Sequence, residues 1–223
     1  MAIVPQALRS LTPVRVRDDP RLRALAVGSG LIPPRRMHSE EDLEVLLAAA
    51  RGAARVVEIG VYEGASAIVL CETLPTSAEL HLIDPFGAHP DALPSGWGAM
   101  EWATRRAVAR ALRRGGAGAP QVHWHIALSH DVAARWSGVV DLVFIDGDHS
   151  ERGCELDWRS WRGHVAPGGC VVFHDARAGR PHGRGLPGPS AVVDALLRDG
   201  ATPGWDLLAE ADRTVAVRRL PAP

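Results

Sequence analysis

Short apolar runs that each end in a turn or an acidic residue are the feature that most constrains the fold of this chain. Residues 55–60 have the pattern of a buried strand ending in a turn, and residues 65–74 have the pattern of a helix closed by Pro75. A second strand is expected over residues 79–83, and it ends at Asp84. This β-α-β order is typical of a parallel sheet that is covered by helices.

The same alternation continues along the chain. Ser39 and Asp42 have the spacing of an N-cap pair, and leucines at helical spacing follow them. Pro167-Gly168-Gly169 is expected to form a turn. Further strands are expected over residues 122–126, 139–145, 170–173, 205–209 and 214–218, and further helices over residues 102–114, 131–135, 151–164 and 190–198. The pattern predicts an α/β fold.

Three segments lack this regular pattern. Residues 1–36 are rich in arginine and proline, and we expect an N-terminal capping segment ahead of one domain over residues 37–223. Residues 86–99 are rich in glycine, proline and aromatic residues and are too long for an ordinary connection, which predicts a lid insertion near residues 86–105. A second loop is expected over residues 176–189. Both loops are expected to become ordered over a bound ligand.

Composition excludes several classes of protein. The formal net charge of -1 gives no broad attraction to nucleic acid or to an anionic membrane. No segment approaches the ~20 apolar residues of a membrane span, and Pro5 and Arg9 interrupt the N-terminus where a signal peptide would be apolar. Cys71, Cys154 and Cys170 have no metal or disulfide spacing and fit buried residues in a reducing compartment. We therefore expect a cytoplasmic protein.

Acidic residues gather at the carboxyl ends of the expected strands. Glu58, Asp84, Asp146 and Asp175 each stand at or directly after the end of an apolar run. In open α/β sheets, ligands bind in the crevice outside those ends. These four carboxylates are therefore expected to border a binding site.

The turn after the first strand, Glu58-Ile59-Gly60-Val61-Tyr62-Glu63-Gly64-Ala65-Ser66, places two glycines four positions apart between a strand and a helix. Such glycines let the backbone approach a ligand, although a tight turn without a ligand has the same pattern. Neither a G-x-G-x-x-G motif nor a P-loop lysine is present. Asp84 fits a carboxylate that accepts hydrogen bonds from a ribose diol, or a loop aspartate that caps a turn.

The sequence resembles the class I S-adenosylmethionine-dependent methyltransferases, in particular catechol O-methyltransferase-like enzymes and natural-product sugar methyltransferases. The glycine turn, L-I-D-P-F at 82–86, D-L-V-F-I-D-G-D-H-S at 141–150 and P-G-G-C-V-V-F-H-D at 167–175 occur in the family's order. The resemblance covers about residues 37–218. It implies a mostly parallel seven-stranded sheet with helices on both faces and an antiparallel C-terminal strand.

The resemblance also implies site residues. Asp84 would hold the ribose of S-adenosylmethionine, Ser129 and His130 would border its adenine, and Asp146 would lie beside the cofactor. A helix cap is the alternative role for Ser129. The methionine end of the cofactor would be lined by Glu58, Gly60, Tyr62, Gly64 and Ser66.

Metal-dependent members of the family bind Mg²⁺ through an aspartate after the fourth strand and an Asp-Asn pair after the fifth. Here Asp146 is in place, but the pair reads His174-Asp175. A histidine suits Mn²⁺, Fe²⁺ or Zn²⁺ better than Mg²⁺. A divalent ion held by Asp146, His174 and Asp175 and a metal-free site in which these residues contact the substrate both remain open.

His149 stands where the catechol-type enzymes place a catalytic lysine, and this chain contains no lysine. Imidazole suits general-base chemistry near neutral pH, so His149 and Asp146 are the expected catalytic residues. The alternative is that His149 caps the helix that follows it.

The expected reaction is methylation of a hydroxyl or amino group on a small polar natural product such as a sugar or an aminosugar, for example an aminoglycoside. An anionic acceptor is an alternative, because its charge could pair with Arg177, Arg180 and Arg184. A nicotinamide- or nucleotide-dependent enzyme and a non-catalytic S-adenosylmethionine-binding protein are the alternative classes. No nucleic acid or membrane partner is expected, and a homodimer is left open.

Overall fold

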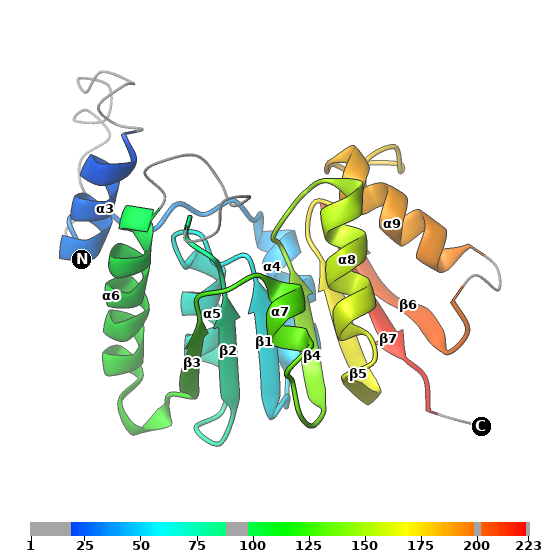
Figure 1. Ribbon diagram of the computed structural model, residues 1–223, viewed down its shortest axis with the longest axis horizontal. Helices are drawn as coiled ribbons and strands as arrows, with labels where there is room; N and C mark the ends of the chain where they lie inside the picture. Colours follow the sequence, from blue (N-terminus) through cyan, green and yellow to red (C-terminus); the bar gives the residue numbers. More distant parts are fainter. Residues whose placement is uncertain (1–18, 88–97, 199–201, 222–223) are drawn as a thin grey trace.

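The computed structural model describes residues 19–87, 98–198 and 202–221. Seven strands in this part of the chain form one sheet in the order β3-β2-β1-β4-β5-β7-β6 (Figure 1). The strands are β1 (Arg55–Ile59), β2 (Glu79–Ile83), β3 (Gln121–His125), β4 (Val140–Ile145), β5 (Val165–Phe173), β6 (Trp205–Ala211) and β7 (Thr214–Arg219). The strand order reverses between β1 and β4, which is where open α/β sheets bind ligands.

Strand directions confirm the predicted sheet. Strands β1 to β5 pair in parallel, and β7 is antiparallel to both of its neighbours, β5 and β6. The chain is therefore a mostly parallel α/β fold in which β7 is the antiparallel strand.

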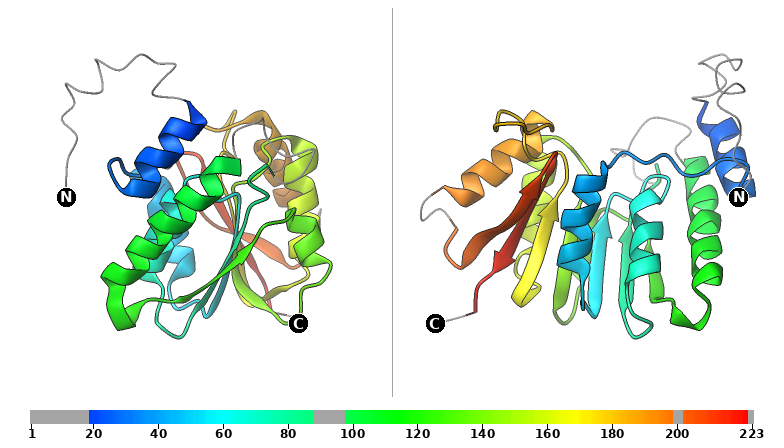
Figure 2. Two further views of the ribbon diagram at one scale, coloured as in Figure 1. Left: turned by 60° about the vertical axis from the view of Figure 1, so that its left-hand side comes forward. Right: turned by 180° about the vertical axis from the view of Figure 1, so that it is seen from behind.

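Helices cover both faces of the sheet (Figure 2). Because successive strand residues face opposite sides, Val56 packs in the core beneath α4 and α5, whereas Val57 packs in the core beneath α7, α8 and α9. The helices are α3 (Pro20–Ser29), α4 (Glu40–Ala50), α5 (Ala65–Thr73), α6 (Gly98–Gly115), α7 (Ser129–Ala133), α8 (Glu151–Trp161) and α9 (Pro187–Leu197), with a short 3-10 helix at Gly116–Gly118.

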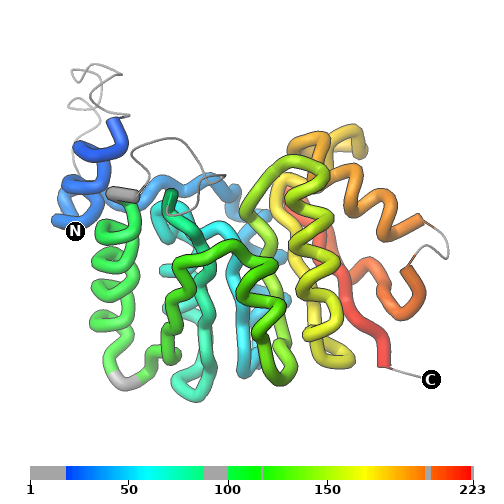
Figure 3. The backbone as a smooth tube through the Cα atoms, viewed as in Figure 1, coloured from blue at the N-terminus to red at the C-terminus, as the bar shows by residue number. Residues whose placement is uncertain are grey.

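Part of the expected irregular N-terminal segment forms a helix, α3, which packs along α6. Arg23 on α3 forms a two-pronged ion pair with the buried carboxylate of Glu63 in the glycine turn. The backbone amide of Arg35 donates to the same carboxylate at 2.6 Å. Residues 30–39, which we call the strap, then cross the carboxyl end of the sheet to reach α4 (Figure 3). The strap is thereby anchored to the glycine turn.

Pro167-Gly168-Gly169, expected to form a turn, lies within the bounds of β5 but at an irregularity of the strand, where Gly168 has φ +83°. Val140 pairs with Val165, but Leu142 already pairs with Cys170, so a register shift absorbs the additional residues. The other elements differ from expectation at their boundaries. β3 begins one residue earlier, α7 lies over 129–133 rather than 131–135, α8 ends at 161 rather than 164, and α9 begins at 187 rather than 190.

Most of the expected lid, residues 88–97, lies outside the described residues, and residues 98–105 form the first turns of α6. The second expected loop is held at its ends by a bridge between Ala176 and Gly185. None of the helices in the described ranges has the length and apolar character needed to cross a membrane.

Candidate active site

The residues that follow the central strands form one row along the carboxyl edge of the sheet. The backbone amides of Asp84, Gly60, Asp146 and His174 each donate to the carbonyl of the last residue of a neighbouring strand, at 2.9–3.1 Å. These bonds extend the parallel ladder beyond β2, β1, β4 and β5. The sheet therefore brings together residues that four separate motifs contribute.

The glycine turn is tightly constrained where it meets β4. Gly60 has φ +86°, and a β-carbon there would overlap the carbonyl group of Asp146 and lie 2.7 Å from Cα of Gly147. Gly64, with φ +83°, begins α5 and lies against Thr104 of α6. Tyr62 between them also has a positive φ of 53°. Glycine at position 60 therefore lets the β1 turn and the β4 turn touch.

Asp84 holds the glycine turn through backbone hydrogen bonds. Its Oδ2 accepts from the amides of Val61 and Tyr62, both at 2.9 Å, and its Oδ1 accepts from the amide of Phe86 at 2.8 Å. Burial raises the pKa of Asp84, although the three amides act in the opposite direction. Oδ1 accepts from one amide within the described residues, so its second lone pair is available to a further donor.

Glu58 is a fully buried carboxyl group beneath the same turn. Its Oε1 accepts from the hydroxyl of Ser66 at 2.5 Å, and Oε2 has no hydrogen-bond partner within the described part of the chain. Burial raises the pKa of Glu58 to about 8; the Ser66 bond lowers it, and the charges of Asp146 and Asp84 raise it. Glu58 is thus a carboxyl group that a cation could stabilise in its ionised form.

Asp146, directly after β4, is the centre of a histidine cluster. Its Oδ2 lies 3.1 Å from Nε2 of His38, and its Oδ1 lies 2.9 Å from Nδ1 of His174 and 3.4 Å from Nε2 of His149. Burial alone would raise the pKa of Asp146, but these three imidazoles hold it well below its ordinary value. Asp146 is therefore an ionised carboxylate that accepts from three ring nitrogens.

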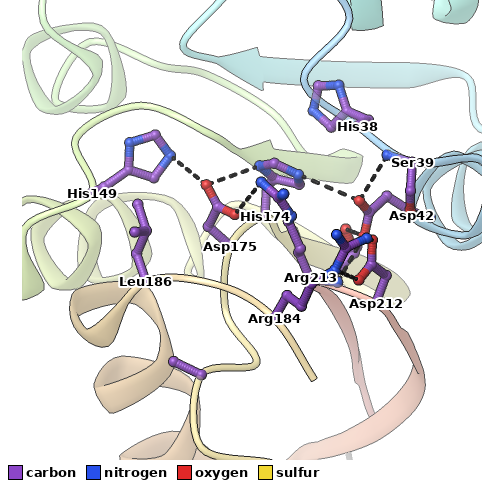
Figure 4. Close-up of polar contacts among 12 residues, drawn as sticks. His38, Ser39, Asp42, His149, His174, Asp175, Arg184, Leu186, Asp212 and Arg213 are labelled. Atoms are coloured by element: carbon purple, nitrogen blue, oxygen red, sulfur yellow. Dashed lines mark hydrogen bonds and ion pairs between the residues drawn. The ribbon is translucent and has the colours of Figure 1, made fainter. Parts of the chain in front are cut away.

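His174 lies between carboxylates on both sides of its ring (Figure 4). Its side chain is only 2% exposed; Nδ1 lies 3.6 Å from Oδ2 of Asp175, and Nε2 lies 3.7 Å from Oδ2 of Asp42. Burial would lower the pKa of His174, but Asp146 and Asp42 raise it far above its ordinary value. Asp42 in turn accepts from the amide of Arg213 at 2.9 Å and the hydroxyl of Thr214 at 2.8 Å.

His149 is the open side of this cluster, with 39% of its side chain exposed. Its Nε2 lies 3.5 Å from Oδ2 of Asp175 (Figure 4). The hydrogen bond to Asp146 raises the pKa of His149, burial lowers it, and the charge of Asp175 raises it further. Ser150, and not His149, caps α8 by accepting from the amide of Gly153. His149 is therefore placed to exchange a proton with a molecule in solvent.

Two residues of the cluster were not expected from the sequence. His38 lies in the strap, where no motif distinguishes it from the other nine histidines of the chain. Asp42 was expected only as the partner of Ser39 in capping α4, and it does form that capping box. Its further bonds to β7 and its contact with His174 have no local sequence signal.

A sequence profile described as a methyltransferase domain matches residues 57–176, more than half of the chain. The chain belongs to this methyltransferase family. The matched region of the methyltransferase contains the glycine turn, Asp84, Asp146, His174 and Asp175. No curated protein matches the sequence.

Solved structures share the methyltransferase fold. The O-methyltransferase TomG from Streptomyces achromogenes, involved in tomaymycin synthesis and solved with SAM, is 20% identical, with 96% of this chain and 95% of TomG covered at a TM-score of 0.55. The O-methyltransferase from Bacillus cereus, solved with SAH, is 16% identical over 95% and 94% of the two chains, with a TM-score of 0.55. Cofactor-bound Rv0187 from MTB is 21% identical over 98% of both chains, with a TM-score of 0.54.

Ser129 and His130 lie at the start of α7 in the methyltransferase. Ser129 is the first residue of α7 rather than its cap, and its buried hydroxyl donates to Asp157 and accepts from Nε1 of Trp161 at 3.3 Å. His130 is partly exposed, with Nε2 3.9 Å from Oδ1 of Asp131. A role of either residue beside adenine stays a prediction. Trp158 and Trp161 are buried.

The arginines of the 176–189 loop are paired with carboxylates of the methyltransferase itself. Arg177 and Arg180 both bind Glu210, and Arg180 also binds Asp194. Arg184 binds Asp212 through two bonds of 2.6 Å. These pairs anchor the loop to the β6–β7 hairpin and weaken the case for an anionic acceptor.

Proposed function

We propose that this methyltransferase transfers a methyl group from S-adenosylmethionine to a hydroxyl or amino group of a small polar natural product. The observation that carries the proposal is Glu58, a fully buried carboxyl with one unpartnered oxygen beneath a glycine turn. A buried polar atom without a hydrogen-bond partner in the protein favours a bound ligand at that position. S-adenosylmethionine is cationic at both its ammonium and its sulfonium. The bound SAM and SAH of the structural neighbours are consistent with this occupant.

The cofactor contacts follow from the row of residues at the sheet edge. Glu58, Gly60, Tyr62, Gly64 and Ser66 surround the methionine end, and the free lone pair of Asp84 Oδ1 accepts from the ribose. Asp146 lies against Gly60 and so borders the transferred methyl. Ser129 and His130 are assigned to the adenine side.

The reaction is a displacement at the sulfonium methyl. A bond forms between the acceptor oxygen or nitrogen and the methyl carbon, the sulfur–methyl bond breaks, and S-adenosylhomocysteine leaves. His149 takes the proton from the acceptor, and Asp146 and Asp175 orient its polar groups. Carboxylates and imidazoles suit a sugar or aminosugar as the acceptor, and an aminoglycoside is one example.

The cluster also fits a divalent ion. The four atoms His149 Nε2, His174 Nδ1, Asp146 Oδ1 and Asp175 Oδ2 have neighbour distances of 2.9–3.6 Å. Ligands about 2.0–2.2 Å from one metal are separated by similar distances. Within the described residues, the expected ligands Asp146, His174 and Asp175 are divided between two sets whose ligand atoms lie within 4.8 Å of one another: His38, Asp146 and His174, and His149, His174 and Asp175. An ion held by either set would act as a Lewis acid on the acceptor oxygen. The mixed nitrogen and oxygen donors favour Mn²⁺, Fe²⁺ or Zn²⁺ over Mg²⁺.

Calorimetry tests the cofactor assignment. S-adenosylhomocysteine is expected to bind with a micromolar dissociation constant, whereas NAD is expected not to bind. Binding of NAD alone would replace the proposal with a nicotinamide-dependent enzyme, and S-adenosylhomocysteine binding without any turnover would support the non-catalytic alternative. Turnover is measured as S-adenosylhomocysteine release with a panel of monosaccharides, aminoglycosides and phenols.

Two variants and a chelator test the chemistry with the acceptor that the panel identifies. His149→Ala is expected to lower kcat by roughly 10²–10⁴ and leave S-adenosylhomocysteine affinity unchanged. His164→Ala, which alters a histidine outside the cluster and the cofactor site, is the matched control and is expected to retain kcat. Exhaustive chelation is expected to abolish turnover, and Mn²⁺ is expected to restore it. Full turnover after chelation, with no metal found by elemental analysis, would contradict the metal site and support a metal-free site in which these residues contact the acceptor directly.

The proposal also covers the cellular compartment and the oligomeric state of the enzyme. All three cysteines are buried and unbonded, as expected in a reducing compartment, so we assign the enzyme to the cytoplasm. The homodimer stays a prediction.

A further inference from the structure

His38 makes a contact that neither the family match nor the sequence motifs assign. The family profile begins at residue 57, so the strap that carries His38 lies outside it. The imidazole is buried, and its Nε2 is 3.1 Å from Oδ2 of Asp146, a residue 108 positions later in the chain. The strap therefore delivers a side chain to the centre of the candidate active site.

The oxygens of Asp146 divide their partners between two sides. Oδ1 faces His174 and His149, and Oδ2 faces His38. Because the carboxylate is ionised and can only accept, Nε2 of His38 carries the hydrogen and donates it. This bond fixes rotation of the carboxylate about its Cβ–Cγ bond, which keeps Oδ1 directed at the two histidines.

Packing holds the His38 ring in the orientation that this bond needs. Its centroid lies 4.3 Å from that of His174 and 5.7 Å from that of Phe144. Its Nδ1 is buried and has no partner among the residues that the structure describes. Among the described residues, the side chain of His38 thus makes one hydrogen bond, to Asp146. The strap is anchored close by, where the Arg35 amide donates to Glu63.

We propose that His38 is a positioning residue that orients the Asp146 carboxylate toward His174 and His149. The assignment rests on the proposed function for its catalytic meaning, since Asp146 borders the acceptor there. Residues that orient a metal-ligating side chain commonly affect metal affinity or activity by about 10–100-fold, and we expect an effect of this size for the Asp146 carboxylate. His38 does so through Asp146 and does not itself contact the acceptor.

The test compares variants that separate the hydrogen bond from the ring packing. His38→Phe keeps an aromatic ring against His174 and Phe144 but removes the donor, and His38→Gln keeps an N–H donor but removes the ring. His38→Met is a second donor-free variant in case the phenylalanine does not fold. His164→Phe alters a histidine outside the cluster and is the control.

Nuclear magnetic resonance of protein with ¹⁵N-labelled histidine gives a readout that needs no acceptor. In chelator-treated, metal-free protein, the Nδ1 proton of His174, which is bonded to Asp146, is expected to give a downfield, slowly exchanging signal in the parent protein, His38→Gln and His164→Phe. In the donor-free variants this signal is expected to move upfield or broaden through exchange. An unchanged signal in a folded donor-free variant would overturn the proposal, as would loss of the signal in a folded His38→Gln variant.

Cofactor binding separates this proposal from the proposed function. S-adenosylhomocysteine affinity is expected to stay within about threefold of the parent in all variants, because the hydrogen bond and ring contacts of His38 are to Asp146, His174 and Phe144, of which only Asp146 is assigned to the cofactor. If the parent protein does not bind S-adenosylhomocysteine, the proposed function fails while the resonance result still decides the role of His38. With an identified acceptor, kcat is expected to fall 10–100-fold in His38→Phe and to recover in His38→Gln, with KM for S-adenosylmethionine unchanged.

Discussion

Gly60 leaves no room for a side chain because its α-carbon lies against the carbonyl group of Asp146. The contact joins the turn after β1 to the turn after β4, and those two strands are neighbours in the sheet. The glycine turn and the histidine cluster are therefore parts of one packed unit. Any change that separates Gly60 from Asp146 is expected to disturb both.

Gly60→Ala tests this contact directly. The alanine would meet backbone atoms that cannot rotate away, and its φ of +86° adds strain. We expect the free energy of unfolding to fall by about 3 kcal/mol or more and S-adenosylhomocysteine binding to be lost. Gly52→Ala is the matched control, because Gly52 has φ +77° with nothing within 4 Å of a β-carbon. Urea denaturation should give it a loss of only about 1 kcal/mol, and equal losses in the two variants would contradict the steric argument.

Asp84→Asn separates the two uses of this carboxylate. The asparagine keeps one acceptor oxygen, so it can hold either the amides of Val61 and Tyr62 or the ligand side, but not both. We expect S-adenosylhomocysteine affinity to weaken by about 1–3 kcal/mol in calorimetry. Adenine alone, which has no ribose, should lose much less. An unchanged dissociation constant for S-adenosylhomocysteine would remove Asp84 from the ribose site.

Glu58→Gln is expected to change how stability depends on pH. The pKa of Glu58 is raised from 4.5 to about 8 in the folded protein, so the folded state holds this proton more tightly than the unfolded state. The stabilisation is complete below pH 4.5 and is lost as pH rises through 8, by an amount on the order of a few kcal/mol. Urea titrations between pH 6 and 9 should show this loss in the parent and in an exposed control, Glu44→Gln. Glu58→Gln should show a flatter profile, and an identical slope would argue against the buried carboxyl.

A stack of three histidines on β2 and β3 is expected to make the folded protein less stable at low pH. His81 stacks on His123 and on His125, with centroids 4.6 Å and 5.3 Å apart, and its Nε2 lies 3.7 Å from Oε2 of Glu79. Burial and the two neighbouring histidines lower the pKa of His81 to about 4, although Glu79 raises it. The unfolded state therefore binds more protons between pH 4 and 6.5.

The stability that comes from neutral His81 is complete above pH 6.5 and is lost as pH falls toward 4. His81→Phe keeps a stacked ring without a titrating group, so its free energy of unfolding should fall less between pH 7 and 4.5 than that of the parent. The difference is expected to be on the order of 1–2 kcal/mol. His164→Phe serves as the control outside the stack, and equal acid sensitivity in all three proteins would count against this explanation.

The carboxyl ends of the central strands can be predicted from the sequence, because each apolar run and the residue that follows it are adjacent in the chain. Asp84, Asp146 and His174 each follow an apolar run directly, so a strand prediction also predicts their place at the sheet edge. The same reasoning missed that Pro167-Gly168-Gly169 lies within β5, because pairing with β4 resumes at Cys170 after a register shift, and no local sequence signal shows that shift.

His38 and Asp42 could not be found in this way. His38 meets Asp146 only because the strap is anchored to Glu63 at another point, and nothing near position 38 encodes that path. Asp42 looks like a helix cap and is one, but its second use depends on β7. Local patterns predict one role for each residue, whereas a tertiary contact adds a second.

The bond between Asp42 and the hydroxyl of Thr214 joins residues 172 positions apart. During synthesis the N-terminal part of the chain emerges first, and contacts of such long sequence separation form late. Asp42 and His174 therefore stay open to water on the ribosome until the final hairpin has been made. A nascent or prematurely terminated chain can pair β1 to β5, yet without β7 its Asp42 lacks the two bonds that hold it beside His174, so the histidine cluster would be incomplete.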